Sequence, residues 1–252
     1  MKNYMTYLEK LHELNDKTLK IFLKTLKDRE LINNQETELE ETFLMELYRY
    51  HQRKDSIEIV VKLFEDKVIT KEEIRKLHRV VIKGSSDDQP KNYNYRSDND
   101  KWVGSYGTGG KINVDYYPPD YHEIGNLMDY SLEFLNNDSS TSNLNSLLIK
   151  PFIVHGLIAY IQPFGNGNTR LSRVLQHGKI WQMTNDNLGT NLSLPVLYLS
   201  KNYLMTRPQY RQLISKIATE QNWNAWINYN LNMVDEQLYY AGDNLQKVKR
   251  ML

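Results

Sequence analysis

The stretch from residue 144 to residue 185 constrains the fold of this chain more than any other. Residues 144–160 are strongly apolar and are predicted to form one helix, and residues 169–185 are predicted to form a second. The loop between them reads QPFGNGN. Backbone amides at the start of a helix lack partners and carry partial positive charge, so they bind phosphate groups. Because Gly165 and Gly167 let the backbone approach an anion closely, the loop is predicted to be an anion-binding cradle.

Most of the remaining sequence is predicted to be helical, because apolar residues recur at helical spacing. The run Thr70-Lys71-Glu72-Glu73 is typical of a capping box at the start of a helix. Alternating residues on both sides of a glycine-rich turn at 107–110 predict a β-hairpin. We therefore expect a mainly α-helical protein with one small hairpin, with helices near residues 5–32, 36–51, 56–66, 70–84, 120–136, 144–160, 169–185, 206–221 and 223–248.

The composition is that of an ordinary soluble globular protein, with 40% hydrophobic and 25% charged residues in a chain of 252. The net charge of +1 gives no reason to expect binding to nucleic acid or to an anionic membrane. The absence of cysteine excludes disulfides, thiolate metal sites and cysteine catalysis. No stretch reads as a signal peptide or as a transmembrane helix. We therefore expect a cytoplasmic protein, and export by a non-classical system stays open.

The loop and the helix start after it resemble the core motif of the Fic family, H-P-F-x-[D/E]-G-N-G-R-x-x-R. The chain departs from this motif at three positions. Gln162 stands in the place of the His, Asn166 in the place of the acidic residue, and Thr169 in the place of the second Gly. The positions that match the motif are Pro163, Phe164, Gly167, Asn168, Arg170 and Arg173.

Shorter segments before and after the motif also occur in the order seen around a Fic core, so the resemblance covers about residues 69–235. It implies the Fic (fido) helical fold with a hairpin flap. The implied organisation is an N-terminal helical extension over 1–68, a Fic core domain over 69–235, and the end of a C-terminal helix over 236–252.

The Fic family binds a nucleoside triphosphate and typically transfers AMP from ATP to a hydroxyl group of a target protein. The resemblance therefore implies a nucleotide site in this loop, with Arg173 at the terminal phosphate. An alternative is that the arginines are surface charges that pair with Asp or Glu. The implied nucleotide-binding residues are Phe164, Gly165, Gly167, Asn168, Thr169, Arg170 and Arg173.

The two departures at Gln162 and Asn166 weaken the expected chemistry. Gln162 lies at the general-base position, but an amide cannot take a proton at neutral pH, and loss of such help is worth about 10²–10⁴-fold in rate. Asn166 is a neutral, weaker Mg²⁺ ligand than a carboxylate. His155 and His177 are expected to be structural, so neither replaces the base. The substitutions are consistent with natural decay or with engineering.

The hairpin corresponds in position to the flap that aligns target side chains in Fic enzymes, so the resemblance implies a protein target. The implied flap residues are Gly104, Ser105, Tyr106, Ile112, Asn113 and Val114. Many Fic proteins also carry an inhibitory helix with the pattern [S/T]-x-x-x-E-[G/N]. Glu41, four residues after Thr37, and Glu46, four after Thr42, fit it in part, and an ordinary solvated acidic face is an equal alternative.

Three functions follow as hypotheses. The chain is a nucleotide-binding Fic protein with impaired transferase activity, a working transferase that moves AMP to a protein hydroxyl, or an interaction scaffold that binds no nucleotide. Gln162 favours the first, because the anion-binding part of the motif is kept while the base is absent. The target protein and the nucleotide preference stay open, and so does assembly into a homo-oligomer.

Overall fold

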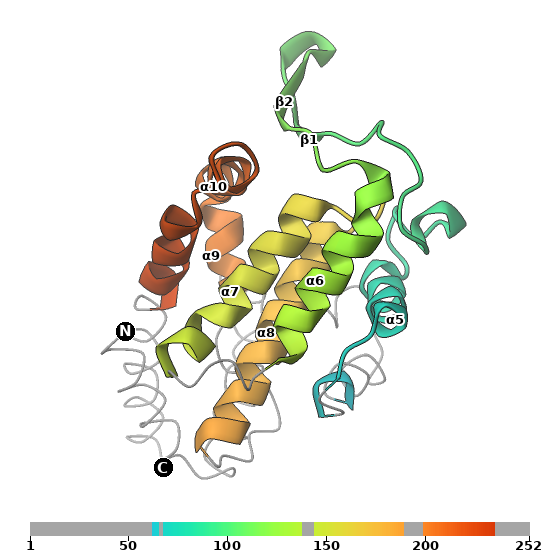
Figure 1. The fold of residues 1–252 in the computed structure, drawn as a ribbon. Coiled ribbons are helices and arrows are strands. Elements are labelled where there is room, and N and C mark those ends of the chain that lie inside the picture. Colours follow the sequence, from blue (N-terminus) through green and yellow to red (C-terminus); the bar gives the residue numbers. More distant parts are fainter. Residues whose placement is uncertain (1–61, 66–67, 138–143, 189–198, 235–252) are drawn as a thin grey trace, which may run out of the picture.

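The computed structural model describes residues 62–65, 68–137, 144–188 and 199–234. Within these ranges the protein is mainly helical, with one two-stranded antiparallel sheet (Figure 1), which confirms the predicted fold class. The helices predicted at 5–32 and 36–51 lie outside the described residues. The described helices are a segment over residues 62–65, α5 (Lys71–Ile82), α6 (Ile124–Asn136), α7 (Leu144–Ile161), α8 (Asn168–Leu188), α9 (Leu199–Met205), α10 (Arg207–Glu220) and a last one over residues 223–234.

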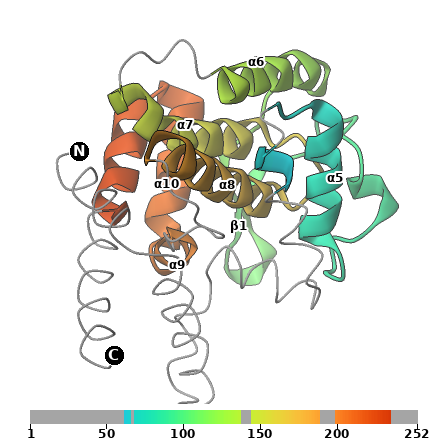
Figure 2. The ribbon, with the colours of Figure 1, turned by 90° about the horizontal axis from the view of Figure 1, so that it is seen from below.

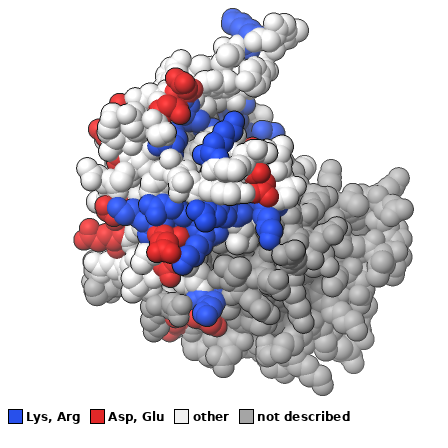
Figure 3. Space-filling model, turned by 90° about the vertical axis from the view of Figure 1, so that its right-hand side faces the viewer, with Lys and Arg blue, Asp and Glu red and all other residues white. Residues whose placement is uncertain are grey.

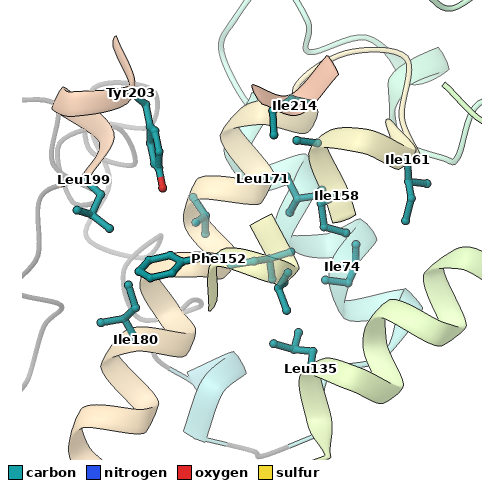
Figure 4. Close-up of a cluster of buried hydrophobic side chains, with 14 of the residues drawn as sticks. Ile74, Leu135, Phe152, Ile158, Ile161, Leu171, Ile180, Leu199, Tyr203 and Ile214 are labelled. Atoms are coloured by element: carbon teal, nitrogen blue, oxygen red, sulfur yellow. The ribbon is translucent and has the colours of Figure 1, made fainter. Parts of the chain in front are cut away.

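Helices α7 and α8 pack against each other at the centre of the described fold. Figures 1 and 2 show α6 and α10 beside α7, and α5 beside α8. A helix with apolar residues on all sides is stable only when other elements cover it, which explains the central place of α7. Its side chains Phe152 and Ile158 lie in the core cluster of Figure 4. None of the described helices combines the length and apolar character of a membrane span.

The capping box at Thr70 is formed as the sequence predicts. The Thr70 side chain accepts a hydrogen bond from the Glu73 amide at 3.3 Å, and the Glu73 carboxylate accepts one from the Thr70 amide at 2.7 Å. Helix α5 begins at the next residue, and its apolar face turns inward. The buried residues of that face are Ile74, Leu77, His78, Val81 and Ile82.

Two elements differ from the prediction. The helix expected from residue 120 begins as a 3₁₀ turn, η4 (Tyr121–Glu123), because the Asp120 side chain accepts a hydrogen bond from the His122 amide. Helix α9 was not expected as a separate element, since seven residues give little periodicity to detect. It nevertheless buries Leu199 and Tyr203, one turn apart, against the core.

The hairpin pairs β1 (Val103–Tyr106) with β2 (Ile112–Tyr116), and a bulge lies next to Val103. Figure 1 shows it projecting from the helical body. Its base is attached to two helices. The Tyr116 hydroxyl donates to the carbonyl oxygen of Ala159 on α7 at 2.5 Å, and Asp115 forms an ion pair with Arg211 on α10. The base is therefore fixed, while the rest of the hairpin extends into solvent.

Candidate functional site

The loop that joins α7 to α8 makes two turns that an ordinary backbone avoids. Gln162 has a φ of 48° and Gly167 a φ of 80°, both in the left-handed region. At Gly167 a Cβ atom would also lie 2.5 Å from Cγ2 of Ile82 and 2.9 Å from Nε2 of His78. Only glycine fits this position, which brings the start of α8 close against α5. A non-glycine residue held at a positive φ marks position 162 as a place of functional interest.

Phe164 fixes the loop from inside the protein. Its side chain is fully buried, and its ring stacks on that of His78 with centroids 3.7 Å apart. Tyr95 meets the same ring edge-on, and the Arg96 amide donates to the Pro163 carbonyl at 2.8 Å. Phe164 therefore shapes the loop, and its predicted part in nucleotide binding stays a prediction.

Asn168 also holds the loop together. Its Oδ1 accepts from the Phe164 amide at 2.9 Å, while Nδ2 donates to the Phe164 carbonyl at 2.7 Å and to Gln162 Oε1 at 3.0 Å. Both N–H bonds of the amide are used, so in this conformation Asn168 organises the cradle from within. A direct contact of Asn168 with phosphate stays a prediction.

Gln162 turns its side chain into the loop. Nε2 donates to the Ala159 carbonyl at 2.7 Å, Oε1 accepts from Asn168, and the residue is only 7% exposed. Arg96 fixes the backbone, since its Nε donates to the Gln162 carbonyl at 3.0 Å. An amide is no base at neutral pH, and here it is also held in hydrogen bonds on both sides. The side chain at the general-base position is thus a structural group in this conformation.

The histidines and the tyrosine near the loop are buried, and burial shifts the pKa of each. His78 donates from Nε2 to the Asn166 carbonyl at 2.8 Å, and burial lowers its pKa to about 4. Burial raises the pKa of Tyr116, so its hydroxyl stays protonated at neutral pH. His155 and His177 are fully buried in the core, where burial lowers the pKa of each to about 3. Their predicted structural role agrees with these positions.

The two motif arginines have different surroundings. Arg170 pairs with Asp87 and donates to the Ser85 hydroxyl at 3.2 Å, which is the ion-pair alternative considered for these arginines. Arg173 is half-buried on the next turn of α8, and its charge contributes to the lowered pKa of His177 after the larger effect of burial. The structure thus gives Arg170 a role in attaching α8 to the segment after α5, and its contact with phosphate stays a prediction.

Asn166 and Thr169 lie on the exposed side of the cradle, and Gly165 lies against Asn92. The side chain of Lys101, which the sequence did not predict to be part of the site, approaches this side of the loop. Lys101 donates from Nζ to the Gly165 carbonyl at 2.6 Å and to Asn166 Oδ1 at 3.5 Å. Lys101 precedes Gly165 by 64 positions, and a contact over such a separation cannot be predicted from a local sequence pattern. Among the described residues, no group of three or more His, Cys, Asp or Glu side chains is placed to hold a metal ion.

Positive charge gathers on the face of the molecule seen in Figure 3. On helix α5, Arg75 and Arg79 lie over the rings of Tyr95 and Tyr93, at 5.0 and 5.3 Å from their centroids. Cation–π contacts of this kind hold guanidinium groups in place without neutralising them. Arg75 therefore lies over the Tyr95 ring, and that ring in turn contacts Phe164 of the loop.

The six residues predicted for the flap all lie on the hairpin. Across the two strands, Gly104 pairs with Val114, Ser105 with Asn113, and Tyr106 with Ile112. Three of their side chains are large, apolar and exposed, at 73% for Tyr106, 48% for Ile112 and 38% for Val114. The candidate inhibitory residues Glu41 and Glu46 lie outside the described residues.

Comparison with known proteins agrees with this geometry. Residues 68–177 match the Fic/DOC family. A Fic domain containing signaling protein from Bacteroides thetaiotaomicron has a similar structure, with a TM-score of 0.62 at 18% identity over 98% of this chain and 96% of that one.

Two longer proteins share the fold over part of their length. A Fic family protein from Desulfovibrio desulfuricans gives a TM-score of 0.53 at 18% identity over 73% of this chain and 50% of its own. Fic-1 from C. elegans gives 0.52 at 13% identity over 78% of this chain and 51% of its own. This chain thus spans about half the length of these two relatives. The chain thus carries a match to the Fic/DOC family over residues 68–177, and it has the mainly helical Fic fold with a two-stranded hairpin.

Proposed function

We propose that this protein binds a nucleoside triphosphate, ATP in the first place, in the loop between α7 and α8, and that its transfer of AMP to proteins is impaired. The match of residues 68–177 to the Fic/DOC family supports the ligand class, since nucleotidyl transfer to proteins is the general activity of Fic proteins. The observation that carries the impairment is the position of Gln162, whose amide is hydrogen-bonded to Ala159 and Asn168 inside the loop.

The binding part of the proposal rests on the start of α8. The first amides of a helix have no acceptor within the helix and attract anions. Phe164 and Asn168 hold the loop in shape, and Gly165 and Gly167 bring its backbone close to the ligand. Thr169 lies exposed on the first turn. In this proposal Arg173 contacts the terminal phosphate and Arg170 contributes positive charge from the side of Asp87.

The missing base is tested by measuring AMP transfer directly. With ATP labelled on the α-phosphate, the unmodified protein should transfer label to itself or to an acceptor protein about 10²-fold or more slowly than the Gln162→His variant. The shorter amide in Gln162→Asn should leave transfer at the level of the unmodified protein. Histidine is among the residues that tolerate a positive φ, so the substitution suits the backbone at this position.

Two other outcomes would favour the competing functions. Label transfer by the unmodified protein at the rate of the Gln162→His variant would identify a working transferase in which Gln162 only orients the acceptor. A melting temperature that ATP does not raise would point to a scaffold, because a ligand that binds the folded state alone stabilises it, by about 2.7 kcal/mol at a hundredfold excess over Kd. The proposal requires that ATP raise the melting temperature.

The hairpin is the proposed contact for a protein target. Extended peptides add to exposed strand edges through backbone hydrogen bonds, and side chains next to the edge give specificity. The exposed Tyr106, Ile112 and Val114 provide apolar contacts beside such an edge. Inhibition of nucleotide binding by Glu41 or Glu46 stays a hypothesis, because both residues lie outside the described residues.

A further inference from the structure

Lys101 occupies the side of the loop where a Fic motif carries its acidic residue. Its ammonium group donates to the Gly165 carbonyl at 2.6 Å and lies 3.5 Å from Oδ1 of Asn166. The side chain reaches this place from the segment just before β1 and is half-buried there. The ammonium group of Lys101 therefore lies next to Asn166, the position that corresponds to the Mg²⁺-binding acidic residue of the Fic motif.

The residues present do not fit a magnesium ion. Mg²⁺ prefers charged oxygen ligands in near-octahedral geometry, and Asn166 offers only a neutral carbonyl oxygen. An ammonium group at 3.5 Å from that oxygen also repels a divalent cation. Among the described residues no cluster of acidic or histidine side chains makes up for this loss.

The charge of Lys101 is available to an anion. None of the ion pairs among the described residues involves it. A carboxylate that acts on its charge is that of Asp87, which forms an ion pair with Arg170. Burial lowers the pKa of Lys101, and the charge of Asp87 opposes that change. Of the three N–H donors of an ammonium group, the loop oxygens of Gly165 and Asn166 use two.

We propose that Lys101 takes the place of the metal ion, so that this protein binds the triphosphate of a nucleotide without a divalent cation. The third N–H of the ammonium group would donate to a phosphate oxygen, next to the amides at the start of α8. Lysine serves as a compact point charge for phosphate in other nucleotide sites. This inference rests on the proposed function, because it concerns the same nucleotide site.

The inference is tested by isothermal titration calorimetry of ATP, once with excess Mg²⁺ and once with EDTA. The unmodified protein should bind ATP in EDTA at least as tightly as with Mg²⁺. Lys101→Met should weaken binding in EDTA by about tenfold or more, the usual worth of a hydrogen bond to a charged group. Lys111→Met, at an exposed lysine of the hairpin, is the matched control and should leave the affinity unchanged.

A second pair of variants separates charge replacement from simple support of the loop. In Asn166→Asp the new carboxylate should pair with Lys101, and binding should stay independent of Mg²⁺. In Asn166→Asp with Lys101→Met the carboxylate is left without its cation, and tight binding should return only when Mg²⁺ is present. A double variant that binds in neither condition would show that Lys101 only supports the loop, and would overturn the inference.

The two proposals fail in different ways. Binding of ATP by the unmodified protein only with Mg²⁺ would overturn the role of Lys101 and leave the nucleotide site standing. The absence of binding in both conditions would overturn the nucleotide site, and the inference with it.

Discussion

At the scale of single residues, the loop is stabilised by groups that bond to one another. Gln162 accepts from Asn168, Asn168 bonds to both backbone groups of Phe164, and Arg96 donates to the Gln162 carbonyl. Buried polar groups that are fully paired fix one geometry, whereas unpaired ones are costly. Gln162 therefore satisfies a donor of Asn168. These hydrogen bonds keep the shape of the cradle.

Gly167 and Gly125 give a matched test of this geometry. Gly167→Ala should lower the free energy of unfolding by about 2 kcal/mol or more, because alanine is strained at a positive φ and its Cβ would meet Ile82 and His78. In helix α6 a Cβ at Gly125 meets nothing within 4 Å, so Gly125→Ala should stabilise the protein by about 0.5–1 kcal/mol. Urea unfolding measures both. Equal effects at the two sites would contradict the geometry of the loop.

At the scale of elements, the hairpin is attached through the end of β2. Asp115 pairs with Arg211 on α10 and accepts through its carbonyl from the Ser215 hydroxyl at 3.0 Å, while Tyr116 is bonded to α7. The exposed residues lie further out. A fixed base with a solvent-exposed outer part suits an element that presents a strand edge to a partner, because the edge keeps its direction while its pairing groups stay open.

Removing the attachment should loosen the hairpin and leave the cradle intact. Asp115→Ala should cost about 1–3 kcal/mol of stability, since the ion pair with Arg211 is largely shielded from solvent. Hydrogen exchange followed by mass spectrometry should show faster exchange in β1 and β2 and unchanged exchange in α8. The exposed pair Lys76–Glu72 is the control, and Lys76→Ala should change neither. Faster exchange in α8 after Asp115→Ala would show that the hairpin and the cradle unfold together.

At the scale of the whole molecule, three histidines in the part of the chain that the structure describes are buried in the helical body. Burial lowers the pKa of His78 to about 4, and those of His155 and His177 to about 3. In the unfolded chain a histidine titrates near 6.5. Between these values the unfolded state binds more protons than the folded state, so stability is fully present above about pH 6.5 and falls as the pH decreases.

The free energy of unfolding should therefore decrease from pH 7 to pH 5, by up to about 1.4 kcal/mol per pH unit for each buried histidine. Urea unfolding at pH 7, 6 and 5 measures the slope. His78→Asn should reduce the slope by the share of one histidine, because an amide can still donate to the Asn166 carbonyl and does not titrate. A stability that does not change over this range would contradict the burial of the three rings.

The sequence predicts the parts of this structure that depend on local patterns. The capping box at Thr70, the hairpin and the central helices follow from residue types at short spacing. The contacts that complete the site are not local. Lys101 reaches Gly165 across 64 positions, Arg96 reaches Gln162 across 66, and Asp87 reaches Arg170 across 83. These pairs form only when α5 and the segment before β1 pack against the loop. They therefore cannot be predicted from a periodicity or a motif in the sequence.

The central claim is that the cradle between α7 and α8 binds the phosphates of a nucleotide. Chemical-shift mapping of the backbone amides during titration with ATP tests it most directly. The largest shifts should fall on Gly165, Gly167 and the first turn of α8, and Arg173→Ala should reduce them. Shifts that fall instead around Arg75 and Arg79 of α5, or an absence of shifts in the loop, would contradict this claim.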